Sequence, residues 1–403
     1  MRFRGLSTTL IAVTAATCVG CASTIAGNPS PGLTPVDIES LATGVFTPEP
    51  TAYDPDYSIP LIRRLDAYRI LAKLVHSYEV DPEIDELGTI EVFESPGVMI
   101  QEDTFPPKYE RASVDNRLLS GVYVSRINDS LRSRKKLIIS VLRFPTEELS
   151  RKAAVDFDQI TNDEPGRHVI PIDGYPTALT SSADDITAIS FIAHGPYVIM
   201  VNAGIPQPDQ AALAEVLRKT LSLQIPRIDE LEIIPLDEIL DSPIDPDGIL
   251  RRALPPASDY KDYSDPFKGD RDFGALAPSA QLHFERNPAA AKQAFDEAGV
   301  DLVARRGGVV YRTRDLEASF ALQSALMKAE QNDEELPPPP GLPDVRCLLL
   351  EELDPARSYN TTCAVVFGRY VAVVYWALPY YSRSTANLYE RAAAQYAILA
   401  RSE

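Results

Sequence analysis

The sequence predicts an α+β protein of two duplicated halves, after an N-terminal signal peptide and a tether. Each half is expected to be an antiparallel sheet with helices covering one face. Two observations support this prediction. Stretches with the same order of strand-like and helix-like segments occur twice in the 403 residues, at nearly constant spacing. In addition, 45% of the residues are hydrophobic, and a chain of this length suits two domains with cores of their own.

The clearest internal similarity joins "HGPYVIMVNAGIP" to "FGRYVAVVYWALP". Each stretch predicts a turn glycine, a β-strand and a proline that ends the strand. With the two stretches in one fixed register, identical amino acids align at Gly195 and Gly368, Tyr197 and Tyr370, Val198 and Val371, Val201 and Val374, and Pro206 and Pro379.

A second similarity lies upstream of the first. "LIISVLRFPTEELSRKAAVDF" and "GVVYRTRDLEASFALQSALM" each predict a strand followed by a helix, and Arg143 aligns with Arg312 at nearly the same spacing. Chance similarity between two strand–helix units is the alternative explanation. In both copies a closing helix is also predicted, with one apolar side formed by Leu213, Val216, Leu217 and Leu221 in the first and Tyr389, Ala392, Ala393 and Ala397 in the second.

These patterns divide the chain into five segments. Residues 1–20 are predicted to be a lipoprotein signal peptide, and residues 21–58 a flexible tether rich in Pro, Ser, Thr, Gly and Asp. The first α+β domain is expected at 59–226, beginning with an amphipathic helix. A linker dense in Pro and Asp follows at 227–290, and the second α+β domain, with one disulfide, at 291–403.

The signal peptide is indicated by Arg2 and Arg4, which precede a short apolar run of small residues. The last residues of this run, Cys18-Val19-Gly20-Cys21, resemble the lipobox of bacterial lipoproteins, although Cys18 stands where Leu is usual. The resemblance implies that Cys21 becomes the acylated first residue of the mature protein, carrying chains such as palmitate. The alternative is an ordinary signal peptide that leaves Cys21 unmodified.

Cysteine use agrees with an exported protein. If Cys18 leaves with the signal peptide and Cys21 carries lipid, Cys347 and Cys363 remain, and an exported chain lies where disulfides persist. These two residues are therefore predicted to form one bridge that joins two neighbouring strands. A structural zinc site would need four ligands, and the four histidines are scattered along the sequence, so no metal site is expected.

The formal net charge is −19. Such an acidic chain disfavours nucleic acid as a partner, because phosphate binding needs clusters of Lys and Arg. It also disfavours direct docking on anionic lipid headgroups, so membrane attachment would depend on the acyl chains. After the first residues, no segment is long and apolar enough to predict a transmembrane helix.

The whole mature chain resembles a group of actinobacterial (mycobacterial or nocardial) envelope lipoproteins of unassigned function. The shared features are the lipobox, "VDIESLATGVF", "YEVDP" after the first helix, and "RFPTEELSRKAA" at the strand-to-helix step. The second half also resembles, loosely, the extracellular sensor domains of some mycobacterial membrane kinases. The resemblance implies a lipid-anchored protein on the extracytoplasmic face of the cell membrane, and it supplies no catalytic residues.

A search for catalytic motifs assigns no catalytic residue and no cofactor. The sequence contains no Gly-x-Ser-x-Gly and no phosphate-binding Gly-rich motif. A Ser-His-Asp set can be written from Ser181, Ser182, Asp184 and His194, but no spacing fixes its geometry. Acidic loops such as "DSPIDPDG" and "DYKDYSDPFKGDRD" could bind calcium loosely, although solvated acidic loops are the favoured interpretation.

Aromatic residues give the remaining indication of a binding site. Four of them lie at the end of the last repeated strand and in the loop after it, and they could form a ligand surface for glycan or lipid. The alternative is that these side chains alternate into the core. The four residues are Tyr375, Trp376, Tyr380 and Tyr381.

Taken together, these features favour a non-enzymatic module that binds an envelope ligand or protein. Two alternatives stay open. One is an envelope hydrolase that acts on cell-wall glycan or lipid, and the other is a carrier that shields a lipid between the sheet and helices of one half. A deep apolar pocket would favour the carrier. Converging carboxylates or a Ser–His contact would favour the hydrolase, and a shallow aromatic surface would favour the binding module.

Overall fold

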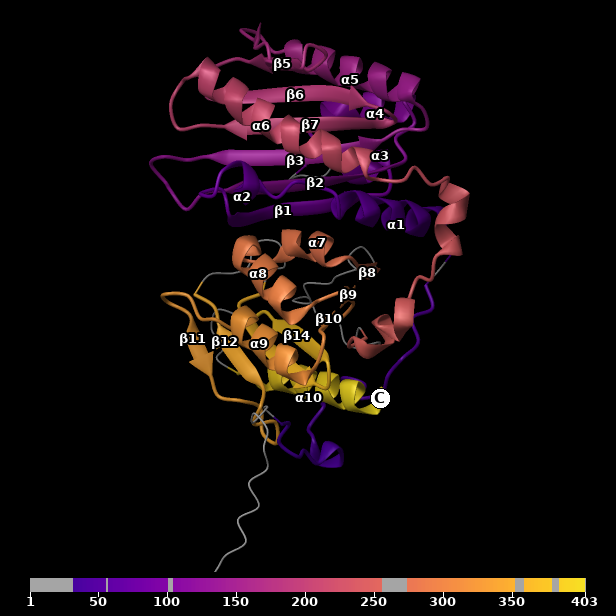
Figure 1. Ribbon diagram of the computed structural model, residues 1–403, viewed down its shortest axis with the longest axis vertical. Helices are drawn as coiled ribbons and strands as arrows, with labels where there is room; N and C mark the ends of the chain where they lie inside the picture. The colour runs from indigo at the N-terminus through magenta and orange to yellow at the C-terminus, as the bar shows by residue number, and fades with distance from the viewer. Residues whose placement is uncertain are drawn as a thin grey trace, which may run out of the picture. The chain divides into compact units, whose positions relative to one another are not determined.

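The computed structural model describes residues 32–55, 57–100, 104–255, 274–351, 359–378 and 384–402. The predicted signal peptide and Cys21 lie outside these ranges. Within them, the first half contains a seven-stranded antiparallel sheet in the order β1-β2-β3-β7-β6-β5-β4 (Figure 1). Its strands are β1 Glu86–Phe93, β2 Ser120–Ile127, β3 Lys136–Arg143, β4 His168–Val169, β5 Leu179–Ser182, β6 Thr187–His194 and β7 Tyr197–Gly204.

Helices cover both faces of this sheet, which corrects the expectation of one covered face. On one face, Phe157 of α5 packs with Phe191 and Met200 of the sheet, and on the other, Leu217 of α6 packs with Ile199. Burial on both faces explains why β3 reads as a nearly continuous apolar run. The helices of this half are α1 Ile59–Leu71, α2 Ser77–Val80, α3 Pro96–Met99, α4 Glu110–Asp115, α5 Glu147–Asn162 and α6 Gln210–Asp229.

The second half repeats the arrangement with a seven-stranded antiparallel sheet in the order β8-β9-β10-β14-β13-β12-β11. Helices α8 and α9 pack on one face and α10 on the other. The strands are β8 Gly274–Leu276, β9 Leu302–Arg305, β10 Val309–Arg312, β11 Glu334–Leu336, β12 Arg346–Leu349, β13 Thr361–Phe367 and β14 Tyr370–Trp376. The helices are α7 Pro278–Gln281, α8 Pro288–Ala298, α9 Leu316–Leu326 and α10 Ala386–Arg401.

The α+β class and the duplication are confirmed, because corresponding strands hold corresponding places in the two sheets. Arg143 pairs with Tyr197 across β3 and β7, and Arg312 pairs with Tyr370 across β10 and β14. The turn glycines predicted from the repeat, Gly195 and Gly368, both have φ of 53°. This left-handed conformation is accessible to glycine at little cost, which accounts for glycine in both tight turns.

Hydrogen bonds repeat between the halves as well. Ser150 on α5 donates its hydroxyl to the Gly195 carbonyl at 2.6 Å, and Ser319 on α9 donates to the Gly368 carbonyl at 3.1 Å. Each helix is thereby fixed to the turn of the hairpin beneath it. Both helices also begin with a side-chain cap, Thr146 in the first half and Asp315 in the second, as the residue types favour.

A buried glutamine on each closing helix holds an earlier backbone segment. Gln224 on α6 donates to the Lys73 carbonyl at 3.0 Å and accepts from the Val75 amide at 2.9 Å. Gln395 on α10 makes the same two contacts with Arg252 and Leu254, at 2.7 and 2.8 Å. In the first half, these two hydrogen bonds explain why α1 ends at Leu71 although the apolar pattern continues to Val80. The Gln224 side chain binds the Lys73 carbonyl and the Val75 amide, which would otherwise bond within a longer helix.

Two segments expected outside the domains are folded against the second half. Residues 32–55, part of the predicted tether, place Phe46 in the core beside α10 and connect Thr34 to Asp344 by two hydrogen bonds. Within the predicted linker, β8 pairs with β9. The whole of "DYKDYSDPFKGDRD" lies outside the described residues, whereas Asp245 accepts from the Leu250 amide and Asp247 accepts from Arg312.

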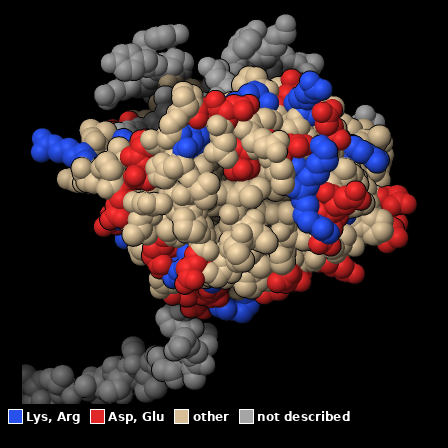
Figure 2. All heavy atoms as spheres, turned by 90° about the horizontal axis from the view of Figure 1, so that it is seen from above, with Lys and Arg blue, Asp and Glu red and all other residues tan. Residues whose placement is uncertain are grey.

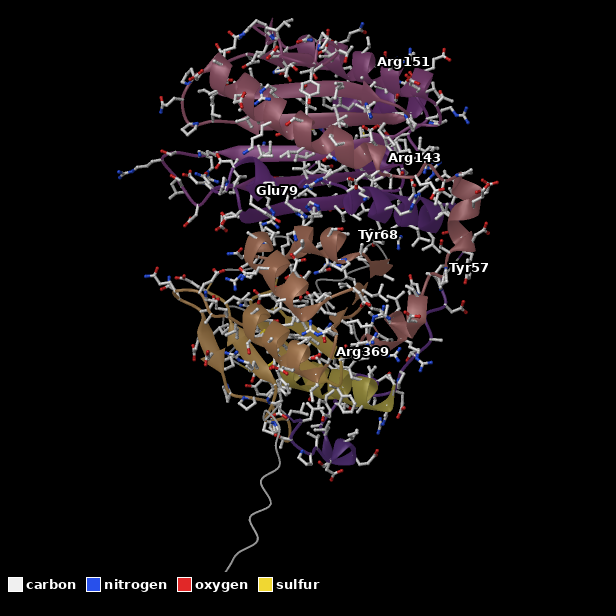
Figure 3. The ribbon with its side chains drawn as sticks, in the orientation of Figure 1. Tyr57, Tyr68, Glu79, Arg143, Arg151 and Arg369 are labelled. Carbon is white, nitrogen blue, oxygen red and sulfur yellow. A yellow bond between two sulfur atoms is a disulfide. The ribbon has the colours of Figure 1, made fainter. Side chains whose placement is uncertain are left out.

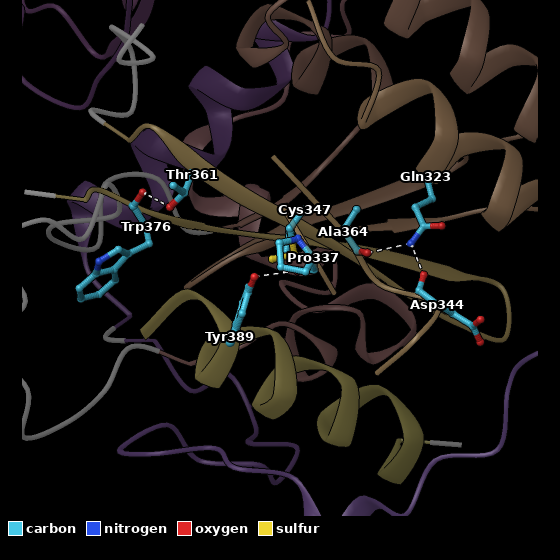
Figure 4. The surroundings of a disulfide bond; sticks show 9 residues. Gln323, Pro337, Asp344, Cys347, Thr361, Ala364, Trp376 and Tyr389 are labelled. Atoms are coloured by element: carbon cyan, nitrogen blue, oxygen red, sulfur yellow. Dashed lines mark hydrogen bonds between the residues drawn. A yellow bond between two sulfur atoms is a disulfide. The ribbon is translucent and has the colours of Figure 1, made fainter. Parts of the chain in front are cut away.

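The predicted disulfide between Cys347 and Cys363 is confirmed and joins the neighbouring strands β12 and β13 (Figure 4). Next to it, Gln323 of α9 donates to the carbonyls of Ala364 and Asp344, both at 2.8 Å. A loop closed over 16 residues of separation restricts the unfolded chain, which in chain-entropy terms stabilises the fold by about 3 kcal/mol.

Candidate functional site

The larger of the two cavities described below has a volume of about 400 Å³ and lies in the second half, between α8, the end of α9 and the sheet. We call it the C-terminal pocket. A cavity of this size, lined mainly by apolar side chains with a few polar groups, is typical of small-molecule sites. Its lining is formed by Glu285, Arg286, Asn287, Ala290, Ala291, Ala294, Tyr311, residues 325–331, Leu348, Leu350, Tyr359, Thr362, Val373 and Tyr375.

The space in the C-terminal pocket results from small residues on α8. Ala290, Ala291 and Ala294 line the pocket from one side of this helix, and a methyl group fills little of the gap between helix and sheet. The helix itself is well defined at both ends. Asn287 caps the Ala290 amide at 2.9 Å, and Gly299 ends the helix in the left-handed conformation. The wall is therefore part of a fixed element rather than a loop.

The sheet side of the pocket is aromatic. Tyr359 and Tyr375 lie with ring centroids 4.2 Å apart and their planes tilted by 37°. Thr362 lies on the adjacent strand β13, and its buried hydroxyl has no hydrogen-bond partner among the described residues. A buried hydroxyl without a partner is unusual, since such groups are normally satisfied. It provides a polar contact point for a molecule in the pocket.

The polar end of the pocket is formed by Glu285 and Arg286. The buried Glu285 carboxylate accepts from the Tyr311 hydroxyl and from the Gln281 amide, both at 2.7 Å. Arg286 pairs with Glu330 at 2.8 Å and with Asp333 at 3.0 Å. Burial would raise the pKa of Asp333, but hydrogen bonds from the Glu330 amide and from Arg286 outweigh burial and keep this pKa below its ordinary value.

Comparison with protein families identifies the family to which the chain belongs. Residues 53–244 match the N-terminal part, and residues 249–402 the C-terminal part, of a family described as a domain of unknown function (DUF7373). The chain belongs to this family. No curated protein matches it. A solved structure, the extracellular domain of PknH from Mycobacterium tuberculosis, matches at 12% identity and a TM-score of 0.27, over 39% of this chain and 95% of that one.

In this DUF7373 chain, the aromatic residues predicted from sequence have separate locations. Tyr375 lines the C-terminal pocket, whereas Trp376 is buried in the core that contains α10. Tyr380 and Tyr381 lie outside the described residues. The predicted ligand surface of these four residues stays a prediction. Sequence reasoning missed Tyr359, Thr362 and Glu285, and only the density of tyrosines near the last strand pointed toward this region.

The Ser-His-Asp set written from the sequence is not brought together. His194 lies 2.6 Å from Asp229 on α6, and the Ser182 hydroxyl donates to the Thr187 carbonyl at 2.7 Å. Within the part of the chain that the structure describes, no group of three or more His, Cys, Asp or Glu residues could hold a metal ion. No helix there is long and apolar enough to cross a membrane.

Proposed function

We propose that this DUF7373 chain is a lipid-anchored protein of the actinobacterial cell envelope that binds a small, mostly apolar envelope ligand in the C-terminal pocket without reacting with it. The observation that carries the proposal is the pocket itself. Its walls combine alanine methyl groups, tyrosine rings and aliphatic side chains with a smaller set of charged and polar side chains. Such a lining releases water from apolar surface when a ligand enters, which favours binding.

The polar groups of the pocket would orient the ligand. Thr362 offers a hydroxyl without a partner, and Arg286 and Glu285 lie where the helix α8 begins. The tilted rings of Tyr359 and Tyr375 offer flat apolar surface of the kind that packs against sugar rings or acyl chains. An amphipathic envelope molecule, with one polar end and an apolar body, fits this distribution.

Attachment to the membrane is proposed to occur through Cys21, on the extracytoplasmic face. The support is the resemblance of Cys18-Val19-Gly20-Cys21 to a lipobox, together with the acidic net charge of −19, which would not favour anionic headgroups without a lipid.

Replacement of Cys21 by serine is expected to release the protein from the membrane fraction of the native host. Acyl chains supply the membrane affinity, at about 0.8 kcal/mol for each buried methylene group, and serine cannot form the thioether. Partition between detergent-rich and aqueous phases would measure the effect, with Ser23→Ala, which lies after the lipobox, as the control. Retention of the Cys21→Ser protein in the detergent phase would contradict the lipid anchor.

Replacement of Ala290 by phenylalanine is expected to prevent ligand binding. Ala290 is exposed at the rim of the pocket, so a larger side chain can project into the opening without repacking the core. Occupancy should fall by about tenfold or more, because a clash worth about 1.4 kcal/mol is sufficient. Native mass spectrometry of protein purified from its own envelope, before and after organic extraction, would measure the bound mass.

The control for this variant is Ala289→Phe. Ala289 is also exposed, is next to Ala290 on α8, and does not line the pocket. Binding in wild type and in Ala289→Phe, with loss in Ala290→Phe, would support the proposal. A bare mass in wild type, or equal occupancy in both variants, would contradict it.

A lipid carrier is the second candidate, because the apolar lining favours it. The identity of the extracted molecule distinguishes the carrier from the binding module. A diacyl lipid or glycolipid that leaves with organic solvent supports the carrier, and a water-soluble ligand supports a binding module. An envelope hydrolase stays a prediction that no contact among the described side chains favours.

A further inference from the structure

A second cavity, of about 260 Å³, lies in the first half, against the sheet face that α5 covers. We call it the N-terminal pocket. It occupies the place that corresponds to the C-terminal pocket. Met200 and Asn202 of β7 line it, and in the register that aligns Gly195 with Gly368 these positions correspond to Val373 and Tyr375, which line the other cavity.

The chemistry of the two cavities differs because Lys136 lies in the N-terminal pocket. Lys136 begins β3 and is partly buried, and no carboxylate in the described ranges forms an ion pair with it. Burial lowers the pKa of this ammonium group, with no compensating charge. Some cations elsewhere in this half have acidic partners, as Lys152 has in Asp156 at 2.6 Å, and others donate to backbone carbonyls, as Lys219 does to Val80.

Space for a bound group exists beside Lys136. Across the sheet, Lys136 of β3, Gly204 of β7 and Thr187 of β6 lie in one row. Gly204 has no side chain, and an added Cβ would lie 3.4 Å from the Cβ of Lys136 and 3.8 Å from Cγ2 of Thr187. The room at the buried Gly204 is therefore about that of one methyl group, and the space for a larger group is the cavity that Lys136 and Thr187 line.

Further cations line the same cavity. Lys108 and Arg167 both contact the single carboxylate Glu164, with Arg167 at 3.3 Å. The hydrogen bond from Lys108 lowers the pKa of Glu164, which keeps this group ionised. The lining thus holds three cations and one anion, and Lys136 is the cation of this lining for which the described residues supply no carboxylate.

Asn202 adds a polar group without a partner. It lies in the row next to Lys136, opposite Ile138 on β3, and within the described part of the chain its buried Oδ1 has no hydrogen-bond partner. The carboxamide can flip, which exchanges its oxygen and nitrogen, so this position offers either an acceptor or a donor. A ligand that carries negative oxygens and also a hydroxyl group would satisfy both Lys136 and Asn202.

We propose that the N-terminal pocket binds a phosphate group, held by Lys136 and oriented by Asn202. Hydrogen phosphate carries charged oxygens and a hydroxyl, and a phosphorylated polyol headgroup carries the same combination; both fit a volume of 260 Å³. Charge-assisted hydrogen bonds from an ammonium group to phosphate are among the strong ones. In contrast to the C-terminal pocket, this site therefore takes an anion rather than an apolar molecule.

The test is a calorimetric titration of the full chain in detergent micelles with inorganic phosphate at pH 7 and low ionic strength. Wild type is expected to bind in a saturable, one-to-one manner. Lys136→Met, which keeps the length of the side chain but removes its charge, should bind about tenfold more weakly or worse. Lys152→Met, which removes one exposed positive charge, should bind like wild type.

Thermal unfolding without phosphate separates binding from folding. Because Lys136 is partly buried without an anion, Lys136→Met should unfold at the same temperature as wild type or higher, so weaker binding cannot be attributed to misfolding. Absence of saturable binding in wild type, or equal affinity in Lys136→Met, would overturn the proposal. Ala290→Phe should leave phosphate affinity unchanged, which keeps this test independent of the C-terminal pocket.

The source of the phosphate group is identified by a second titration with glycerol 3-phosphate. Tighter binding of the ester than of inorganic phosphate would identify a phosphorylated headgroup as the ligand. Equal affinities would identify free phosphate, and in both cases Lys136→Met must lose the binding for the proposal to stand.

Discussion

Replacement of Asp66 by alanine is expected to lower the free energy of unfolding by about 3–5 kcal/mol, because it leaves Arg143 as a buried charge without its partner. Arg143, labelled in Figure 3, lies at the end of β3 and forms a hydrogen-bonded ion pair with Asp66 on α1. Both side chains are buried. Ser120 also donates to Asp66, and Arg143 donates to the Ile234 carbonyl at 2.7 Å. The pair thus joins α1, two strands and the segment after α6.

The duplication supplies a matched control for this variant. Arg312, the equivalent of Arg143, pairs with Asp247 at 2.6 Å, but the Asp247 side chain is 70% exposed. Water replaces a lost partner at an exposed position, and Arg312 keeps its second partner Asp301 at 2.6 Å, so Asp247→Ala should leave the unfolding midpoint in urea nearly unchanged. An equal loss in both variants would show that burial is not the cause.

A double variant also tests whether the unpaired charge of Arg143 causes the loss of stability. Adding Arg143→Met to Asp66→Ala removes the unpaired buried charge and should restore a large part of the lost stability. If the double variant is less stable than Asp66→Ala alone, Arg143 stabilises the fold through other contacts, such as that with Ile234, and the assigned cause is wrong.

The sequence could predict the equivalence of Arg143 and Arg312, but not their acidic partners. The arginines lie in strands whose apolar pattern repeats, so the register could be aligned. Asp66 lies in α1, whereas Asp247 follows a short turn within the predicted linker, and these two segments have no common pattern. Residue positions in the repeated strands can therefore be predicted from the sequence. Contacts that these strands make with non-repeated segments cannot.

The two pockets could not be predicted for a related reason. The alanines on α8 predict only a stable helix. The local sequence does not indicate that the facing sheet leaves space beside them. From the sequence, Lys136 is likewise predicted only to be a polar residue at the start of a strand. Its lack of a partner depends on β6, β7 and α5 together. Tyr375 was the single lining residue of the C-terminal pocket that aromatic content indicated.

The face shown in Figure 2 illustrates why net charge alone says little about binding. Acidic and basic side chains lie next to one another around its margin, with uncharged residues across its middle. Paired surface charges screen one another. Specific charge recognition in this protein is therefore expected where a cation has no partner, as at Lys136, rather than where the total charge would place it.

A pair of stacked histidines, His76 and His283, makes stability depend on pH. Their ring centroids are 4.0 Å apart, and both residues are buried. Burial lowers the pKa of His76 to about 4; Arg227, Arg126 and Lys292 add to the effect and Glu79 opposes it. The pKa of His283 is lowered well below its ordinary value by burial, then by His76, Arg126 and Arg227, against a hydrogen bond at Leu74.

Acidification from pH 7.5 to pH 4.5 is therefore expected to destabilise the protein. Both histidines have a lower pKa in the folded than in the unfolded state, so the unfolded chain binds more protons as the pH falls below about 6.5. The stability that neutral histidine contributes is present above pH 6.5 and is lost as pH falls toward 4. For His76 alone, a pKa of about 4 corresponds to a loss of about 3 kcal/mol at most.

Urea unfolding of wild type and His76→Gln at pH 7.5 and pH 4.5 would measure this contribution. Glutamine does not titrate, so His76→Gln should lose less stability on acidification than wild type, even though the lost ring stacking lowers its stability at pH 7.5. Carboxylates titrate in the same window, and the difference between the two proteins removes their contribution. His168→Gln is the control, because this histidine is exposed and does not belong to the stacked pair. The same loss of stability in wild type and His76→Gln would mean that His76 takes up its proton in the folded state, and that the stacked pair tolerates the charge.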